Sequence, residues 1–125
     1  MTNIGRTMLT LGMLILATAI CSTAFAADDI VKVAPNNCKV LLDNDKVRVI
    51  EYTAKPGEKI GMHSHPANVV YLISGGGKTR FTMENGKTEE RELKAGDAVW
   101  IDAVTHATEN IGKEKTLVLL VEMKN

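Results

Sequence analysis

The chain has 125 residues, with 15 basic and 15 acidic side chains and a formal net charge of zero. No basic run or patch stands out that would neutralise phosphates, so we expect no nucleic-acid partner. The length suffices for one domain with one hydrophobic core, and not for two.

The first 26 residues are typical of a cleavable signal peptide. Arg6 supplies a short positive region, the run from Met8 to Ile20 is apolar and uncharged, and Ala24-Phe25-Ala26 supplies a small-x-small cleavage pattern. The apolar run is shorter than the roughly 18 to 20 residues of a membrane span, so we expect no stable anchor after cleavage. These signals predict cleavage after Ala26, a periplasmic or secreted protein, and a mature domain over residues 27–125. Loss of Arg6 leaves this domain with a net charge near −1.

Cys38 is the only cysteine that remains once the segment holding Cys21 is removed. The exported domain therefore has no internal disulfide, and its stability depends on packing. Two interpretations of the Cys38 thiol stay open: a buried, inert side chain, or one available for a bridge between molecules.

Short aliphatic and β-branched runs, separated by turn residues every eight to twelve positions, fill the chain after the leader. Asn85-Gly86 strongly favours a tight hairpin turn. No segment shows a sustained helical period with caps. The expected strands are a lead-in edge strand between Val31 and Val40, then residues 39–42, 47–53, 57–66, 69–73, 78–83, 88–93, 98–101, the later part of 102–110, and 116–123. This pattern predicts an all-β fold, an antiparallel sandwich or barrel.

Two of the three histidines, His63 and His65, lie two positions apart in one of these expected strands. Successive side chains of a strand alternate between its faces, so both imidazoles project from the same face. Neutral imidazole nitrogens suit iron, nickel, copper, zinc and manganese, so this spacing predicts a metal site.

The histidine spacing resembles the two signatures of the cupin family. Gly57 precedes His63-x-His65 by five residues, as in the first signature, and Gly96 precedes Asp102, then His106 and Asn110, as in the second. The resemblance covers the mature chain from about Val47 onward. It implies a double-stranded β-helix, or jelly-roll barrel, over about residues 39–123, with a metal held by His63, His65 and His106.

The chain departs from this family at one informative position. Most metal-binding cupins place a glutamate four or five residues after the second histidine, where this chain has Val69 and Val70. Counting back from Gly75 instead places that position at Asn68. Asn68 is therefore a candidate fourth metal ligand or substrate contact, with a plain loop role as the alternative. Asp102 and Val104 also replace the family's usual proline and glycine, and this predicts an altered turn.

A metal held by three neutral histidines keeps its full positive charge and favours an anionic ligand. The pattern is similar to that of the three-histidine iron cupins, which implies one divalent transition metal, with iron favoured and Mn, Ni, Zn or Cu as alternatives. It also implies a dioxygenase acting on a small anionic substrate. The alternatives are a non-catalytic module that binds a small ligand or a metal, and a metal-free isomerase-like or carbohydrate-binding barrel.

Other side chains are secondary candidates. The aromatic residues of the mature chain are either core residues or cavity lining: Tyr52, Tyr71, Phe81 and Trp100. Three carboxylates are candidate partners for imidazole N–H groups: Glu51, Asp102 and Glu109. Exposed edge strands in small jelly rolls are commonly paired between subunits, so we expect a homodimer.

Overall fold

The computed structural model describes residues 27–125, and the expected signal peptide lies outside the described residues. Within this part the chain forms one short helix and nine strands. They are, in chain order, α1 (Ile30–Val33), β1 (Cys38–Asp43), β2 (Val47–Ala54), β3 (Lys59–His65), β4 (Asn68–Ser74), β5 (Gly77–Met83), β6 (Thr88–Leu93), β7 (Ala98–Ile101), β8 (Val104–Asn110) and β9 (Thr116–Met123). No helix in the described part is long and apolar enough to cross a membrane.

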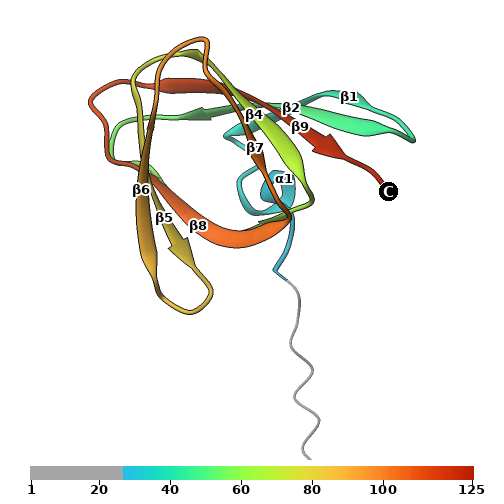
Figure 1. Cartoon of the computed structure of the whole chain (residues 1–125), viewed down its shortest axis with the longest axis horizontal. Coiled ribbons are helices and arrows are strands. Elements are labelled where there is room, and N and C mark those ends of the chain that lie inside the picture. Colours follow the sequence, from blue (N-terminus) through green and yellow to red (C-terminus); the bar gives the residue numbers. More distant parts are fainter. Residues whose placement is uncertain (1–26) are drawn as a thin grey trace, which may run out of the picture.

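The strands form two antiparallel sheets that face each other across the interior (Figure 1). The larger sheet has the order β1-β2-β9-β4-β7, and the smaller has the order β3-β8-β5-β6. Neighbours in each sheet are mostly distant in sequence, as in a jelly roll. The expectation of an all-β jelly roll is confirmed.

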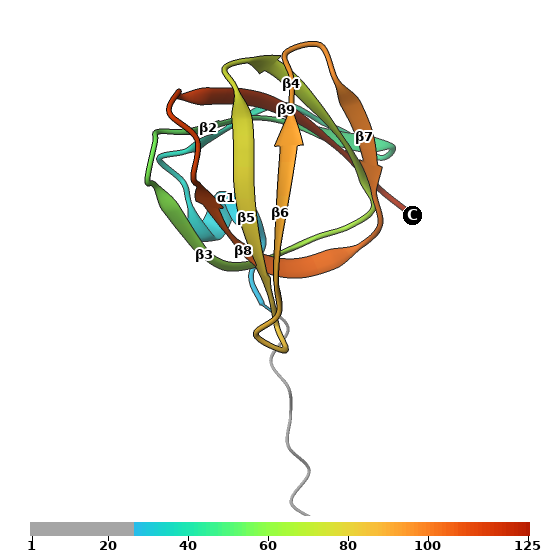
Figure 2. The ribbon, with the colours of Figure 1, turned by 60° about the vertical axis from the view of Figure 1, so that its left-hand side comes forward.

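The hairpin predicted at Asn85-Gly86 joins β5 to β6 (Figure 2). Gly86 has a φ of 81°, which a side chain rarely allows, and its amide donates to the Met83 carbonyl at 2.9 Å. The hairpin extends beyond the rest of the smaller sheet.

The lead-in segment contains the main correction to the predicted elements. Residues 31–40 were expected to form an edge strand, but Ile30–Val33 form a single helical turn and β1 begins only at Cys38. The Asp29 side chain accepts a hydrogen bond from the Val31 amide at 2.8 Å and caps this turn. Burial of Ile30 fixes it in place and outweighs the β-propensity of the valines.

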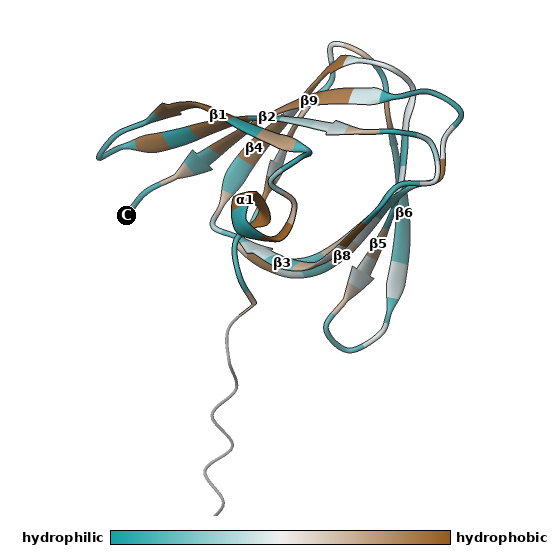
Figure 3. Ribbon diagram, turned by 180° about the vertical axis from the view of Figure 1, so that it is seen from behind, coloured by the Kyte–Doolittle hydropathy of each residue, from teal (hydrophilic) through white to brown (hydrophobic). Residues whose placement is uncertain are grey.

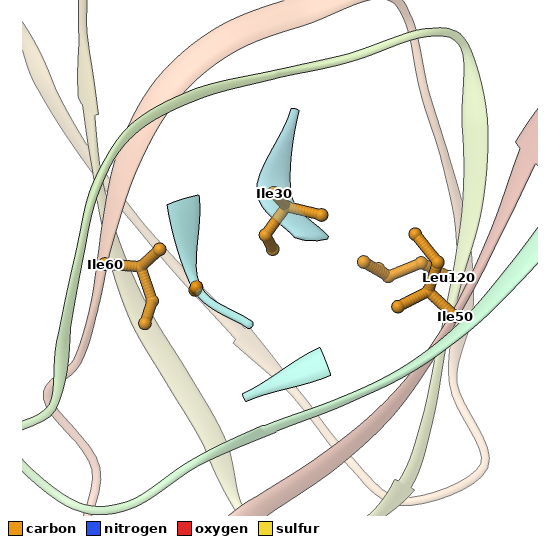
Figure 4. Packing of buried hydrophobic residues seen from close by; sticks show 5 residues of the cluster. Ile30, Ile50, Ile60 and Leu120 are labelled. Carbon is orange, nitrogen blue, oxygen red and sulfur yellow. The ribbon is translucent and has the colours of Figure 1, made fainter. Parts of the chain in front are cut away.

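The helical turn lies between the sheets and completes the core (Figure 1). Ile30 and Ala34 pack with core residues of three strands, Ile50, Ile60 and Leu120 (Figure 4). The lead-in segment also hydrogen-bonds to β3, because the Ser64 amide donates to the Asp28 carbonyl at 2.9 Å. The core and this contact hold β3, which carries two of the histidines, against the rest of the barrel.

Candidate metal centre

Strands β3 and β8 bring the three histidines together inside the barrel. His63 and His65 project from the same face of β3, and His106 lies directly opposite His63 on β8. All three are buried, and one ring nitrogen of each lies within 4.8 Å of the others. Nitrogens bound to one ion at about 2.1 Å would lie within about 4.2 Å of one another, so the cluster is close to the spacing that a shared metal would require.

A bulge in β3 orients His63. The register between β3 and β8 shifts by one residue between Ile60 and His63, and the Gly61 carbonyl accepts a hydrogen bond from His63 Nδ1 at 2.7 Å. Burial lowers the pKa of His63 to about 4, with the nearby His65 adding to the effect, so the ring is neutral at pH 7. Its Nε2 is then an unprotonated lone pair, and it is buried without a hydrogen-bond partner. A buried lone pair of this kind fits a metal ligand, because leaving it unpaired costs stability.

The carboxylate of Glu122, on β9, orients His65. Glu122 Oε1 accepts from His65 Nδ1 at 2.9 Å, and only 2% of Glu122 is exposed. Burial opposes ionisation of this carboxyl, but hydrogen bonds from His65 and Arg48 outweigh it and lower the pKa of Glu122. The ionised carboxylate keeps the proton on Nδ1 of His65 and leaves Nε2 free to bind a metal.

Arg48 holds Glu122 from its other side. Its Nε and Nη2 donate to Glu122 Oε2 at 2.7 and 2.6 Å, and Nη2 lies 3.4 Å from Asp29 Oδ1. Asp29 is the cap of α1, so a continuous polar chain runs from the lead-in helix to His65. Each charge in it has an opposite charge beside it, as burial requires.

His106 completes the set from β8. Burial, together with the neighbouring His63, His65 and Arg91, lowers its pKa to about 3, so this ring is also neutral at pH 7. The Phe81 ring lies against it, with the ring centroids 5.2 Å apart. Imidazole nitrogens gathered this closely form a donor set for late first-row metals.

A cavity of about 180 Å³ lies beside the histidines, between the two sheets. Most of its lining is apolar, including Ile30, Val70, Leu72, Val118 and Leu120. A cavity of this volume has room for a small molecule.

A few polar groups face this cavity. Thr108 Oγ1 is buried without a hydrogen-bond partner, and the Tyr52 hydroxyl lies near it. Burial raises the pKa of Tyr52 to about 12, so its hydroxyl stays protonated and is a donor at pH 7. Arg91 lines both the cavity and a shallow hollow beside the β7–β8 turn, with its guanidinium 5.8 Å from the Phe81 ring centroid. This arginine marks the rim of the cavity and is half exposed.

Residues 50–122 match the profile of the family described as the cupin domain. The chain belongs to the cupin family. The resemblance deduced from the histidine spacing is therefore confirmed. No curated protein matches the chain.

Solved structures agree with this cupin fold. A cupin domain from Bordetella pertussis Tohama I is similar with a TM-score of 0.64 and 24% identity, covering 70% of this chain and 92% of that one. An uncharacterized conserved protein with a double-stranded β-helix domain, from Klebsiella pneumoniae, is 29% identical, with a TM-score of 0.54 over 70% and 76% of the two chains. The DMSP lyase DddQ from Ruegeria pomeroyi is 18% identical, with a TM-score of 0.55 over 70% of this chain and 46% of that one. At such low identity the lyase shows the fold alone.

The other predicted site residues divide into two groups. Asn68 is buried and lines the cavity, where it is the cross-strand neighbour of Glu122, and its Nδ2 donates to the Pro66 carbonyl at 2.9 Å. Tyr52 and Phe81 also line the cavity. Tyr71 and Trp100 do not line it and are not core residues, so neither position expected for them is correct. Strand alternation turns both outward, and they are 40% and 56% exposed.

Sequence reasoning missed Glu122 as the partner of an imidazole. The three carboxylates proposed for that role lie elsewhere: Glu109 accepts from Arg80 at 3.4 Å, Asp102 accepts from the Trp100 indole at 2.9 Å, and Glu51 shares the alternate face of β2 with Val47 and Val49. A signal for Glu122 was present, because it is the only charged residue in the apolar run Thr116–Met123. Its spacing from Leu120 also places it on the inward face.

Cys38 is half-buried, and its thiol lies 3.9 Å from the Ile30 carbonyl. Burial raises the pKa of Cys38 to about 11, with the negative charge of Asp29 adding to the effect. The thiol is therefore protonated and unreactive at neutral pH, in line with the first of its two interpretations.

Proposed function

We propose that this cupin binds one divalent transition metal, with iron favoured, through His63, His65 and His106, and acts as a dioxygenase on a small anionic substrate. The observation that carries the proposal is the buried, unpartnered Nε2 of His63, in a cluster of three histidines whose ring nitrogens lie within 4.8 Å of one another beside a mainly apolar cavity. When bound, such a metal supplies a Lewis acid and a redox centre for oxygen chemistry.

The protein's own residues support an anionic substrate. Three neutral imidazoles leave the charge of a divalent ion uncompensated, unlike a ligand set that includes a carboxylate. Glu122 hydrogen-bonds to His65 but is not itself part of the ligand set, and the paired Arg48 guanidinium offsets its negative charge. Arg91 adds a positive group at the rim, although Glu89 pairs with it at 2.5 Å.

The cavity lining supports oxygen chemistry in two ways. Its apolar walls exclude water and strengthen electrostatic contacts with a bound molecule. The hydroxyls of Tyr52 and Thr108 are polar groups placed to orient that molecule. In a dioxygenase both atoms of O₂ enter the substrate, so no separate electron donor is required. Small molecules that offer a thiolate or an enolate are the classes to test.

Oxygen uptake tests this proposal. Iron-loaded protein is mixed with a panel of thiols, diketones and phenolic acids while O₂ is followed by electrode. The proposal predicts metal-dependent uptake of one O₂ per substrate with at least one class, and loss of uptake in the His63→Ala variant. Metal-loaded protein that binds members of the panel without consuming O₂ would instead be a non-catalytic binding module.

We also propose that the protein is exported and cleaved after Ala26. Support comes from the order of Arg6, the apolar run and the Ala24-Phe25-Ala26 pattern. N-terminal sequencing of the protein from the periplasmic fraction should read Ala27-Asp28-Asp29. A protein that retains Met1 and stays with the cytoplasmic fraction would contradict export.

A further inference from the structure

The outward face of the larger sheet is unusually apolar. Along its strands every second residue lines the interior, as Val118 and Leu120 do on β9 and Val70 and Leu72 do on β4. The residues between them therefore point outward. Hydrophobic positions recur along β1 and β9 (Figure 3).

One row of outward residues crosses all five strands without a polar side chain. Cross-strand register places five residues next to one another in the order Leu42, Val49, Val121, Val69 and Trp100. In the neighbouring row, Leu119 on β9 lies beside Tyr71 on β4, which lies beside Ala98 on β7. We refer to these two rows, together with Ile73 and Met123, as the outer apolar face.

Nothing in the described part of the chain covers this face. Trp100 is 56% exposed, Leu42 is 47% exposed, and Tyr71 and Ile73 are each 40% exposed. Soluble monomers rarely leave a contiguous patch of this kind in water unless it binds something.

The charges around the face favour a second copy of the chain as the occupant. The charged side chains of the two rows are Lys39 on the edge strand β1 and its cross-strand neighbour Glu51 on β2, whose opposite charges sum to zero. A largely apolar face whose few charges sum to zero can meet its own copy without net repulsion between like charges. The face offers no excess of lysine or arginine to attract an anionic membrane.

The size of the face also fits a dimer. Five strands spaced about 4.8 Å apart, over about six residues each, give a flat area of roughly 500 Å², and protruding side chains increase the accessible area above this value. A stable interface buries about 800 Å² on each partner. Contact over most of the sheet, and not only along one edge, is therefore needed.

We propose that two copies of this protein pack their larger sheets face to face, with β9 at the centre of the interface. β9 is the middle strand of five, so a two-fold axis through it places Val121 and Leu119 near their own copies. This arrangement differs from the edge pairing expected from sequence, because it leaves the edge strands β1 and β7 at the rim. It is independent of the metal site and of the proposed activity.

Two measurements on the protein as cells accumulate it test the proposal. They are sedimentation equilibrium and tryptophan fluorescence. Trp100 is the only tryptophan, so its emission reports directly on this face. We expect twice the monomer mass at micromolar concentration. We also expect Trp100 to become less accessible to a soluble quencher as concentration rises. A monomer at up to about 100 µM, with quenching unchanged, would overturn the proposal.

Charge substitutions locate the interface. Val121→Lys should raise the dimer Kd at least about 100-fold, because it buries a charge without a partner at the centre. The matched control is Met62→Lys, which adds the same charge at an exposed position on the smaller sheet and should leave the mass unchanged. If Val121→Lys fails to fold, Tyr71→Lys replaces it, since that side chain is already exposed.

A dimer that survives Tyr71→Lys but dissociates with Met62→Lys would place the interface on the other sheet. A monomer whose Trp100 is protected only by phosphatidylcholine vesicles would identify a membrane as the occupant, contrary to the proposal.

Discussion

Glu122 and His65 lie 57 residues apart in sequence and share a 2.9 Å hydrogen bond from His65 Nδ1 to Glu122 Oε1. The bond joins the two sheets, since His65 is on β3 and Glu122 on β9. The carboxylate contacts Nδ1 of His65, so Nε2 of the same ring stays available for a metal. Its role is to fix which nitrogen of His65 carries the proton.

Glu122→Gln should therefore weaken metal binding while the fold persists. An amide keeps the shape of the carboxylate but loses its charge, and substitutions of such partners typically cost about 10- to 100-fold in metal affinity. Competition against a chromophoric chelator measures this Kd. Glu109→Gln, which changes a carboxylate paired with Arg80, is the matched control and should leave the Kd unchanged. A lower melting temperature with unaltered metal affinity would show that Glu122 is only structural.

Removing Arg48 should destabilise the metal-free protein. Arg48→Met leaves the Glu122 charge buried without its strongest partner, and we expect a loss of about 3 kcal/mol in the free energy of unfolding. This loss is at the low end of the range for breaking a buried ion pair, because the Arg48 side chain is 18% exposed. The double variant with Glu122→Gln has no uncompensated charge and should recover part of the loss in urea unfolding. Additive losses in the double variant would contradict the coupling.

Two glycines with positive φ offer a matched test of the fold. Gly75 and Gly86 have φ values of 90° and 81°. A Cβ at Gly86 meets nothing within 4 Å, whereas one at Gly75 would clash with the Lys115 carbonyl oxygen. Gly86→Ala should cost about 1 kcal/mol in backbone strain alone, and Gly75→Ala more than about 3 kcal/mol. Thermal or urea unfolding measures both losses. Equal losses would contradict the close approach of the β4–β5 turn to Lys115.

The turns and strands could be predicted because their causes are local. Alternating side chains and Asn85-Gly86 specify β5, β6 and their hairpin without knowledge of the rest of the chain. The α1 turn could not be predicted in this way, since one turn leaves no helical period and depends on the Asp29 cap and burial of Ile30. His63 and His65 share a strand, so their proximity was also local. The bond between Glu122 and His65 depends on how two sheets pack, which spacing along the chain does not encode.

Tyr52 should ionise late in an alkaline titration. Its pKa is raised to about 12 by burial, from an ordinary value near 10. The neutral phenol therefore contributes stability that is fully present below pH 10 and is lost as the pH rises toward 12, by at most about 1.4 kcal/mol per pH unit. Near-ultraviolet absorbance of the phenolate follows this titration. Tyr52→Phe should remove the late component and Tyr71→Phe should leave it, so a late component that survives Tyr52→Phe would exclude Tyr52 from the interior.

Elemental analysis of protein purified from cells shows whether His63, His65 and His106 hold one metal ion. We predict about one equivalent of a late first-row transition metal per chain, and its loss in His106→Ala with the β-sheet circular dichroism spectrum retained. Wild-type protein with less than about a tenth of an equivalent of any such metal would show that these histidines hold no ion, and His106→Ala protein with full occupancy would show that His106 is not a ligand.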